Sequence, residues 1–277
     1  LEKNGSIKKG QILYKGQDIT KYSEKQMRDF RGKCCSIIFQ DPMTSLNPVF
    51  TIGNQLKEAI ELHTERRGKE AMARAIEMLT LVGVNEPEKR VKQYPYELSG
   101  GMRQRVMIAM ALACEPDILI ADEPTTALDV TIQAQILELM QSLQKKLGMA
   151  IIMVTHDLGV IADMCDEIIV MYGGRVCERG TAEDIFYRAS HEYTKGLLKS
   201  IPSVDKMGER LVPISGTPIN LLNMPKGCAF CPRCENAMKI CIEEIPPEMQ
   251  MPDGHFASCW MNVKKQMEAQ QEGGNNE

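Results

Sequence analysis

Short apolar segments alternate with segments of helical period through the middle of this chain. The apolar segments are long enough for strands and lie at Cys35–Phe39, Ile118–Ala121, Ala150–Val154 and Glu167–Tyr172. Helical periodicity covers the intervals between and around them, at about Ile52–Val84, Met102–Ala113, Thr131–Leu147 and Leu158–Met164. Buried strands that alternate with helices are typical of a parallel sheet covered on both faces. The sequence therefore predicts an α/β fold built on such a sheet.

The composition is that of a globular protein with a core of its own. Of the 277 residues, 43% are apolar and 25% are charged, close to the average for folded domains. The formal net charge is −4, whereas a nucleic-acid partner calls for a basic patch. We therefore expect no nucleic-acid partner. The longest apolar runs fall well short of the roughly 18–20 residues that span a bilayer.

Two adjacent carboxylates end one of the predicted strands. Asp122 and Glu123 directly follow Ile118–Ala121, at the carboxyl end where α/β folds place their ligands. One carboxylate of such a pair can hold Mg²⁺, and the other can orient a water molecule that attacks a phosphate. An acidic pair also occurs at strand ends without a function, so the neighbouring motifs decide its meaning.

A serine and two glycines precede one of the predicted helices, within the string LSGGMRQR at Leu98–Arg105. Ser99 is placed to cap the helix, whose first N–H groups then point outward. A helix start of this kind binds anions, and glycine lets the backbone approach a phosphate closely. The alternative is a glycine-rich helix cap that binds no anion. His156 follows the strand Ala150–Val154, and a lone histidine is more often structural than catalytic.

The order of these elements resembles the nucleotide-binding subunit of an ABC transporter. LSGGMRQR is followed by the acidic pair, then by ALD at Ala127–Asp129, and then by His156. The resemblance implies a RecA-like parallel-sheet ATPase core with an inserted helical subdomain. It also implies that the protein uses ATP and Mg²⁺.

The resemblance implies roles for individual residues as well. Asp122 would be the Walker B residue that binds Mg²⁺, and Glu123 the general base. His156 would be the switch histidine, and Gln40 the loop glutamine that reaches the metal and the attacking water. Residues of the signature motif and the ALD loop would contact the ATP of a partner subunit or couple the two sites: Ser99, Gly100, Gly101, Gln104 and Asp129.

No G-x-x-x-x-G-K-[ST] phosphate loop occurs in the sequence, although a subunit of this family needs one to hold its own ATP. The nearest match, at Gly68-Lys69, has His63 and Glu70 at the positions of the first glycine and the hydroxyl. We therefore expect an N-terminally truncated ATPase, whose activity alone is in doubt. An alternative is a non-catalytic partner that completes only the other subunit's ATP site.

Two strings narrow the resemblance to the oligopeptide/dipeptide branch of ABC importers. They are FQDPMTSLNP at Phe39–Pro48 and PISGTPINLLNMPKGCAFCPRC at Pro213–Cys234. This branch implies uptake of peptides, or of nickel, at the cytoplasmic face of the cell membrane. The implied partners are a second ATPase subunit, two integral membrane permease subunits and, indirectly, an extracellular substrate-binding protein. A soluble non-transport ABC ATPase would share the central motifs without these strings.

The chain divides into four predicted parts. Residues 1–50 would be the remaining first part of the ATPase core, 51–112 the helical subdomain, 113–180 the second part of the core, and 181–277 a C-terminal extension. Because prolines are frequent in Ile201–Trp260, we expect this segment to have little regular secondary structure. The polar tail Glu268–Glu277 is predicted to be disordered.

Five of the ten cysteines crowd into the extension, which favours metal or cluster ligation. In the importer branch, the positions of Cys228, Cys234, Cys241 and Cys259 are implicated in binding an iron–sulfur cluster. Four thiolates suit either a [4Fe–4S] cluster or Zn²⁺, and plain reduced thiols are a third alternative. Cys231 departs from the family pattern and is either a spare thiol or a competing ligand. Nearby, His255 is interpreted as a solvated loop histidine.

Overall fold

The computed structural model describes residues 5–40, 45–126, 128–201 and 213–273. The chain forms two compact units, Leu1–His156 and Asp157–Glu277, called unit 1 and unit 2 below. The division falls inside the segment predicted as the second part of the ATPase core, and the four predicted domain boundaries stay predictions. Part of the Phe39–Pro48 string and Ala127 of the ALD motif lie outside the described residues.

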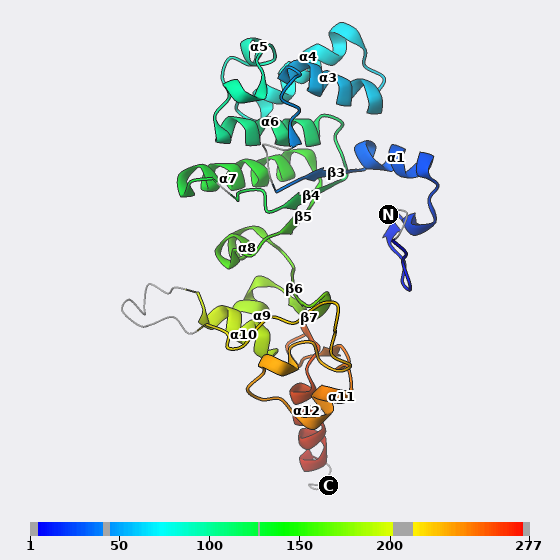
Figure 1. Ribbon diagram of the computed structural model, residues 1–277, viewed down its shortest axis with the longest axis vertical. Helices are drawn as coiled ribbons and strands as arrows, with labels where there is room; N and C mark the ends of the chain where they lie inside the picture. The colour runs from blue at the N-terminus through cyan, green and yellow to red at the C-terminus, as the bar shows by residue number, and fades with distance from the viewer. Residues whose placement is uncertain (1–4, 41–44, 127, 202–212, 274–277) are drawn as a thin grey trace. The chain divides into compact units, whose positions relative to one another are not determined.

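Unit 1 contains the predicted parallel sheet (Figure 1). Its strands are β3 (Cys35–Ile38), β4 (Ile118–Asp122) and β5 (Ala150–Val154), in the order β3-β4-β5. Ile38 pairs with Ala121, and Asp122 pairs with Val154, so the three strands end at the same edge. A separate antiparallel hairpin consists of β1 (Leu13–Tyr14) and β2 (Gln17–Asp18).

The helices of unit 1 agree with the predicted periodicity, with one break. The element predicted over Ile52–Val84 is two helices, α3 (Ile52–His63) and α4 (Gly68–Leu81), which pack on each other. The other helices are η1 (Ile19–Lys21), α1 (Glu24–Lys33), α5 (Pro87–Arg90), η2 (Pro95–Glu97), α6 (Gly100–Leu112) and α7 (Val130–Leu147). Figure 1 shows α3 to α6 gathered as a group beside the sheet. Buried Leu56, Met78 and Ile108 form part of the core of this group.

The expected cover on both faces of the sheet is not seen within unit 1. Helix α6 packs against β3, and α7 packs against α6. In contrast, Ile37, Ile152 and Val154 remain 42–52% exposed. The continuous apolar runs correctly predicted the strands, and the cover of this face stays a prediction.

Unit 2 starts with α8 (Leu158–Met164) and a hairpin of β6 (Ile168–Tyr172) and β7 (Arg175–Gly180). The alternation of elements placed β6 in the parallel sheet, and this part of the prediction was wrong. Gly173 and Gly174 have φ values of +58° and +75°, which suit the tight turn of a hairpin. The chain therefore returns antiparallel, and β6 belongs to a separate sheet of order β6-β7-β9-β8.

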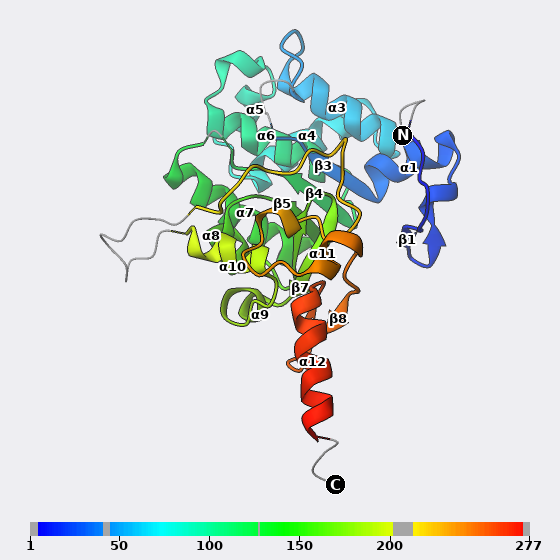
Figure 2. The same cartoon turned by 60° about the horizontal axis from the view of Figure 1, so that its bottom comes forward.

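The rest of unit 2 is built from short elements. They are α9 (Ala182–Tyr187), α10 (Glu192–Lys199), η4 (Cys231–Arg233), α11 (Lys239–Glu243), β8 (Met249–Gln250), β9 (Phe256–Ala257) and α12 (Trp260–Gly273). In Figures 1 and 2, α11 lies beside the start of α12. Helix α12 continues to Gly273, so it extends into the segment predicted as a disordered tail, and the disorder of that tail stays a prediction. None of the described helices is both long and apolar enough to cross a membrane.

Candidate functional site

Three polar side chains converge at one edge of the sheet in unit 1. Glu123 directly follows β4, while Gln40 and His156 each come two residues after β3 and β5. Because the three strands are parallel neighbours, their carboxyl ends deliver these residues to the same place. The structure thus brings together the three residues that the sequence proposes for catalysis.

The Glu123 carboxylate is where these side chains meet. Gln40 Nε2 donates to its Oε2 at 2.7 Å, and Thr126 Oγ1 donates to the same oxygen at 2.9 Å. His156 Nδ1 lies 2.9 Å from Oε1. The hydrogen bond with His156, followed by that with Thr126, holds the pKa of Glu123 below its usual value. The group is therefore an anionic acceptor at neutral pH, as a residue that orients water needs to be.

The backbone of Glu123 is in the left-handed region. Its φ is +46°, which an L-residue with a long side chain seldom adopts. The conformation is fixed on both sides, because Glu123 N–H donates to Val154 O at 2.8 Å and Thr126 N–H donates to Glu123 O at 3.1 Å. Strain of this kind is most often found at functional sites.

Asp122 occupies the last position of β4, opposite Val154 of β5. Its side chain is half-buried. Within the described part of the chain, no hydrogen bond or ion pair uses its carboxylate oxygens. Both oxygens can therefore serve as ligands for a hard cation such as Mg²⁺.

The signature residues and the ALD loop line a single open pocket. Ser99 caps α6 and accepts a hydrogen bond from Met102 N–H at 3.4 Å. Ser99, Gly100 and Gly101 border the pocket together with Asp129, which caps α7. The pocket thus combines two helix starts, whose outward N–H groups favour an anion.

Gly101 is required for packing as well as for access to the backbone. A Cβ at this position would lie 2.9 Å from Ile132 Cγ2 of α7, whereas a Cβ on Gly100 would meet nothing closer than 3.9 Å. Of the two glycines, Gly101 is therefore the one that allows α6 to approach α7 closely.

Gln104 does not line this pocket. Its side chain is 1% exposed, and its amide donates to the carbonyl of Pro124, in the segment just after Glu123. The structure therefore gives Gln104 a contact that joins the signature helix to the end of β4. A buried amide with a backbone partner holds the two segments in register.

The five cysteines of the extension line one pocket in unit 2, together with His191, the N-cap of α10, and Trp260 of α12. Burial raises the pKa of the Cys228 thiol, and the backbone N–H groups of Phe230 and Cys231 oppose this rise by donating to the sulfur. Burial likewise raises the pKa of Cys234 to about 11, against an N–H bond from Asn236. These N–H donors favour the thiolate, which is the form that binds metals.

The other two predicted ligands have the same kind of contact. Burial raises the pKa of Cys259, and the N–H groups of Met261 and Asn262 donate to its sulfur. Met238 N–H donates to Cys241 Sγ at 3.4 Å. A backbone N–H thus favours the thiolate of each of the four predicted ligands, in three cases from a residue two positions further along the chain.

Cys231 differs from these four cysteines. Burial, then the neighbouring thiols of Cys241 and Cys228, raise its pKa, and no backbone N–H acts in the opposite direction. It begins η4. The structure therefore separates Cys231 from the four predicted ligands by its hydrogen bonding.

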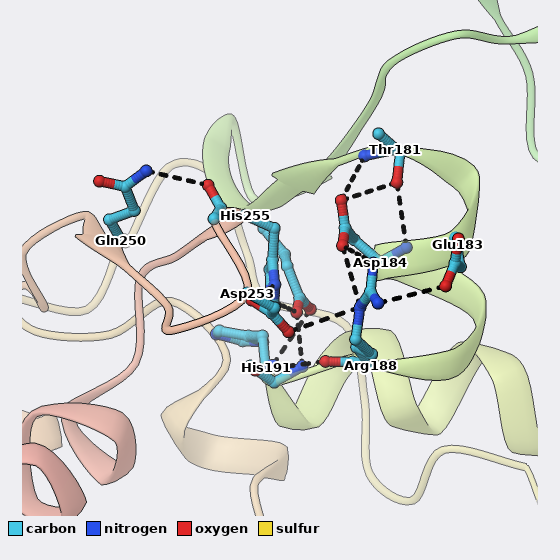
Figure 3. A network of polar contacts seen from close by, with 11 residues as sticks. Thr181, Glu183, Asp184, Arg188, His191, Gln250, Asp253 and His255 are labelled. Carbon is cyan, nitrogen blue, oxygen red and sulfur yellow. Dashed lines mark hydrogen bonds and ion pairs between the residues drawn. The ribbon is translucent and has the colours of Figure 1, made fainter.

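The interpretation of His255 as a solvated loop histidine was wrong. His255 is 3% exposed, and its Nε2 lies 3.1 Å from Oε1 of Glu178, which is fully buried in β7. Its Nδ1 lies 2.5 Å from Asp253. Asp184 and Arg188 continue this polar network (Figure 3). The network joins the strands of the extension to the hairpin of unit 2.

Asp184, Asp253 and His255 bring three potential metal ligands within 4.8 Å of one another. Arg188 already supplies a positive charge there, through contacts of 2.6 Å with Asp184 and 3.5 Å with Asp253. The cluster is therefore neutralised by a side chain, and we interpret it as structural.

The comparisons with known proteins agree with this geometry. Residues 1–126 match the family described as ABC transporter, and residues 177–241 match the family described as oligopeptide/dipeptide transporter, C-terminal region. The dipeptide transport ATP-binding protein DppD of Bacillus subtilis is 51% identical over 262 residues, which are 95% of this chain and 78% of that protein. This chain belongs to the ABC transporter ATPases.

Other relatives match this ABC ATPase over a similar share of its length. The oligopeptide transport ATP-binding proteins OppD of Bacillus subtilis and Escherichia coli are 54% and 49% identical, covering 93% and 96% of this chain and 72% and 78% of their own lengths. Among solved structures, cbiO1 of Clostridium perfringens has a TM-score of 0.57 at 31% identity, over 65% of this chain and 68% of cbiO1. A dimeric ATP-binding cassette with bound ADP and Pi has a TM-score of 0.56 at 28% identity, over 63% of this chain and 74% of its own. The predicted fold class is confirmed, and the chain is an ABC-type ATPase of a class that uses ATP with Mg²⁺.

Two residues of these sites were missed by the sequence analysis of this ABC ATPase. Thr126 binds the Glu123 carboxylate, and its position three residues further along a tight turn was the available signal. His191 lines the cysteine pocket although it lies 37 residues before Cys228 in the chain. No local pattern connects those two residues.

Proposed function

We propose that this ABC ATPase is the ATP-hydrolysing subunit of an importer for peptides, with nickel uptake as a variant within the same branch. The proposal rests on the match of its C-terminal region and on relatives named for oligopeptide and dipeptide transport. The chain would act at the cytoplasmic face of the membrane, bound to a second ATPase subunit and two permease subunits. The extracellular substrate-binding protein would select the cargo.

The convergence of Gln40, Thr126 and His156 on Glu123 is the observation on which the hydrolytic role depends. In this proposal, Asp122 binds Mg²⁺, and the Glu123 carboxylate accepts a proton from the attacking water. Gln40 and His156 fix that carboxylate before nucleotide binds and can turn to the water or the γ-phosphate when it does. Catalysis of phosphoryl transfer depends on such positioning and charge.

The pocket of Ser99, Gly101 and Asp129 would receive the γ-phosphate of the ATP that the partner subunit holds. Its support is the pair of helix starts and the lack of side-chain bulk at Gly100 and Gly101. Two such half-sites in a dimer would close on two nucleotides, so ATP binding would be coupled to a change in the permease subunits.

The test of the hydrolytic role is Glu123→Gln in the assembled transporter. The variant keeps the size of the side chain but removes the proton acceptor, so turnover should fall on the order of 10²–10⁴-fold while ATP stays bound in a closed dimer. Glu88→Gln, an exposed glutamate of unit 1, is the matched control and should leave turnover unchanged. Turnover that survives in Glu123→Gln would remove this residue from the role of base.

A second candidate is a half-site donor that completes only the partner's ATP site, because the pocket of Ser99 does not depend on a phosphate loop in this chain. ATP binding and turnover by the chain alone, and then mixed with the partner ATPase, distinguish the two. Turnover that appears only in the mixture and survives Glu123→Gln would support the half-site donor. A non-transport ABC ATPase is the remaining alternative, and co-purification without permease subunits would favour it.

We also propose that the cysteine pocket holds a [4Fe–4S] cluster through Cys228, Cys234, Cys241 and Cys259. The support is that neighbouring backbone N–H groups lower the pKa of Cys228, Cys234 and Cys259 and that Met238 N–H donates to Cys241 Sγ, whereas among the described residues no backbone N–H has this effect on Cys231. N–H bonds to sulfur are a usual way in which proteins stabilise such clusters. When bound, the cluster would act as a one-electron centre or as a structural clamp on the extension.

Protein purified without oxygen should contain iron and acid-labile sulfide in equal amounts. Cys228→Ser should lose both, and Cys231→Ser, the matched control in the same pocket, should keep both. Stoichiometric zinc, or neither metal nor sulfide, would contradict the cluster.

A further inference from the structure

His191 is a buried polar residue whose placement the ATPase function does not explain. It is 3% exposed and lies at the N-cap of α10. Its side chain lines the cavity that all five cysteines of the extension surround, and it also borders the adjoining hollow beside Cys177 and Cys228. In Figure 3 it lies at the edge of the polar network of unit 2.

The hydrogen bonding of the ring defines where its proton is. Tyr193 N–H donates to His191 Nδ1 at 3.0 Å, so Nδ1 is an acceptor and the proton of the neutral ring is on Nε2. Within the part of the chain that the structure describes, no protein group accepts a hydrogen bond from Nε2. The ring lines the cavity of thiols, so Nε2–H is available to a sulfur acceptor held there.

We propose that His191 donates a hydrogen bond from Nε2 to a sulfur of the group held by Cys228, Cys234, Cys241 and Cys259, and that this bond raises the reduction potential of the group. The inference rests on the proposed cluster. A reduced iron–sulfur cluster has one more negative charge than the oxidised form. A donor beside its sulfurs therefore stabilises the reduced form more. His191 is a positioning and tuning residue in this account and not a ligand.

Two substitutions separate this role from the helix cap that the same ring provides. In His191→Asn, the amide oxygen can replace Nδ1 as acceptor for Tyr193 N–H, but nothing replaces Nε2. In His191→Gln, the longer amide can place an N–H near the position of Nε2, while the cap acceptor is lost. The first variant therefore keeps the cap without the donor, and the second keeps a donor without the cap.

The experiment uses the full chain, reconstituted without oxygen with ferrous iron and sulfide. Iron and sulfide content are measured first, and the midpoint potential follows from a redox titration read by electron paramagnetic resonance. We expect His191→Asn to shift the redox equilibrium about tenfold toward the oxidised form. This shift corresponds to a midpoint potential about 59 mV lower for a one-electron couple. His191→Gln should stay close to the wild type in potential and be the less stable of the two variants to urea.

Each other outcome is decisive. An unchanged potential in His191→Asn with a full cluster overturns the proposal. Equal shifts in both variants also overturn it, because the potential would then follow the cap and not the donor. A wild-type chain that takes up no iron and sulfide overturns the cluster itself. Wild-type cluster content is therefore the result that separates failure of the cluster from failure of the His191 assignment.

Discussion

Replacement of Glu178 by glutamine should destabilise unit 2 strongly. Glu178 is fully buried, and its two oxygens accept the backbone N–H groups of Ser190 and His191 and contact His255 Nε2. Glutamine keeps the volume but has a single acceptor oxygen. One buried N–H therefore loses its partner, at about 1–3 kcal/mol. The amide also replaces a carboxylate oxygen in the contact with His255 Nε2, and the expected loss of unfolding free energy is about 1–3 kcal/mol.

The only tryptophan of the chain makes this effect measurable within unit 2. Trp260 begins α12, and its Nε1–H donates to Glu244 O at 3.0 Å. Its fluorescence during urea unfolding therefore reports on the unit in which Glu178 lies. With a urea slope of about 2 kcal/mol/M, a loss of about 1–3 kcal/mol lowers the midpoint by roughly 0.5–1.5 M.

Glu248→Gln is the matched control for this measurement. Glu248 is 43% exposed and pairs with Arg179 at 2.8 Å, and an exposed pair contributes at most about 1 kcal/mol. If Glu178→Gln shifts the midpoint no more than Glu248→Gln does, the buried carboxylate does not hold the extension to β7, and the reasoning from the orphaned N–H is wrong.

Three further predictions concern residues described above. Hydrogen bonds from Thr181 and then Arg188 lower the pKa of Asp184 to about 2. The ionised carboxylate therefore stabilises the fold fully above its unfolded pKa near 4, and this stabilisation is lost as the pH falls from about 4 to 2. In Asp184→Asn, the urea midpoint should depend less on pH over this interval than in the wild type. Gly101→Ala should destabilise unit 1 by about 1–3 kcal/mol through overpacking, whereas Gly100→Ala should change its thermal midpoint little, and equal effects would contradict the packing argument. Gln104→Leu should lower the free energy of unfolding by about 1–3 kcal/mol, because the Pro124 carbonyl then stays buried without a donor. An unchanged stability in calorimetry would show that water replaces the amide.

The parallel sheet and the meeting of side chains at its edge were predictable, because both follow from where strands end. A polar residue within two positions of the end of each of three parallel strands must come to one edge, so Gln40, Glu123 and His156 could be grouped from the sequence. The hairpin after β6 was not predicted. Its signal, the pair Gly173-Gly174, was visible, but a turn was compatible with either sheet until the pairing partner was known.

The network around His255 could not be predicted for a different reason. Its partner Glu178 is 77 residues away in the chain, and neither residue lies in a periodic apolar pattern that would mark it as buried. The same holds for His191 and the cysteines. Burial of a single polar residue depends on which distant segments pack over it, and composition says nothing about that.

The left-handed backbone of Glu123 has a consequence for selection experiments. A non-glycine residue at φ +46° stores on the order of 1–3 kcal/mol of strain, which glycine would release and asparagine would reduce. A library of this chain selected for resistance to heat should therefore become enriched in the substitutions Glu123→Gly and Glu123→Asn, and both remove the carboxylate. Selection for stability and selection for hydrolysis would then drive this one position in opposite directions.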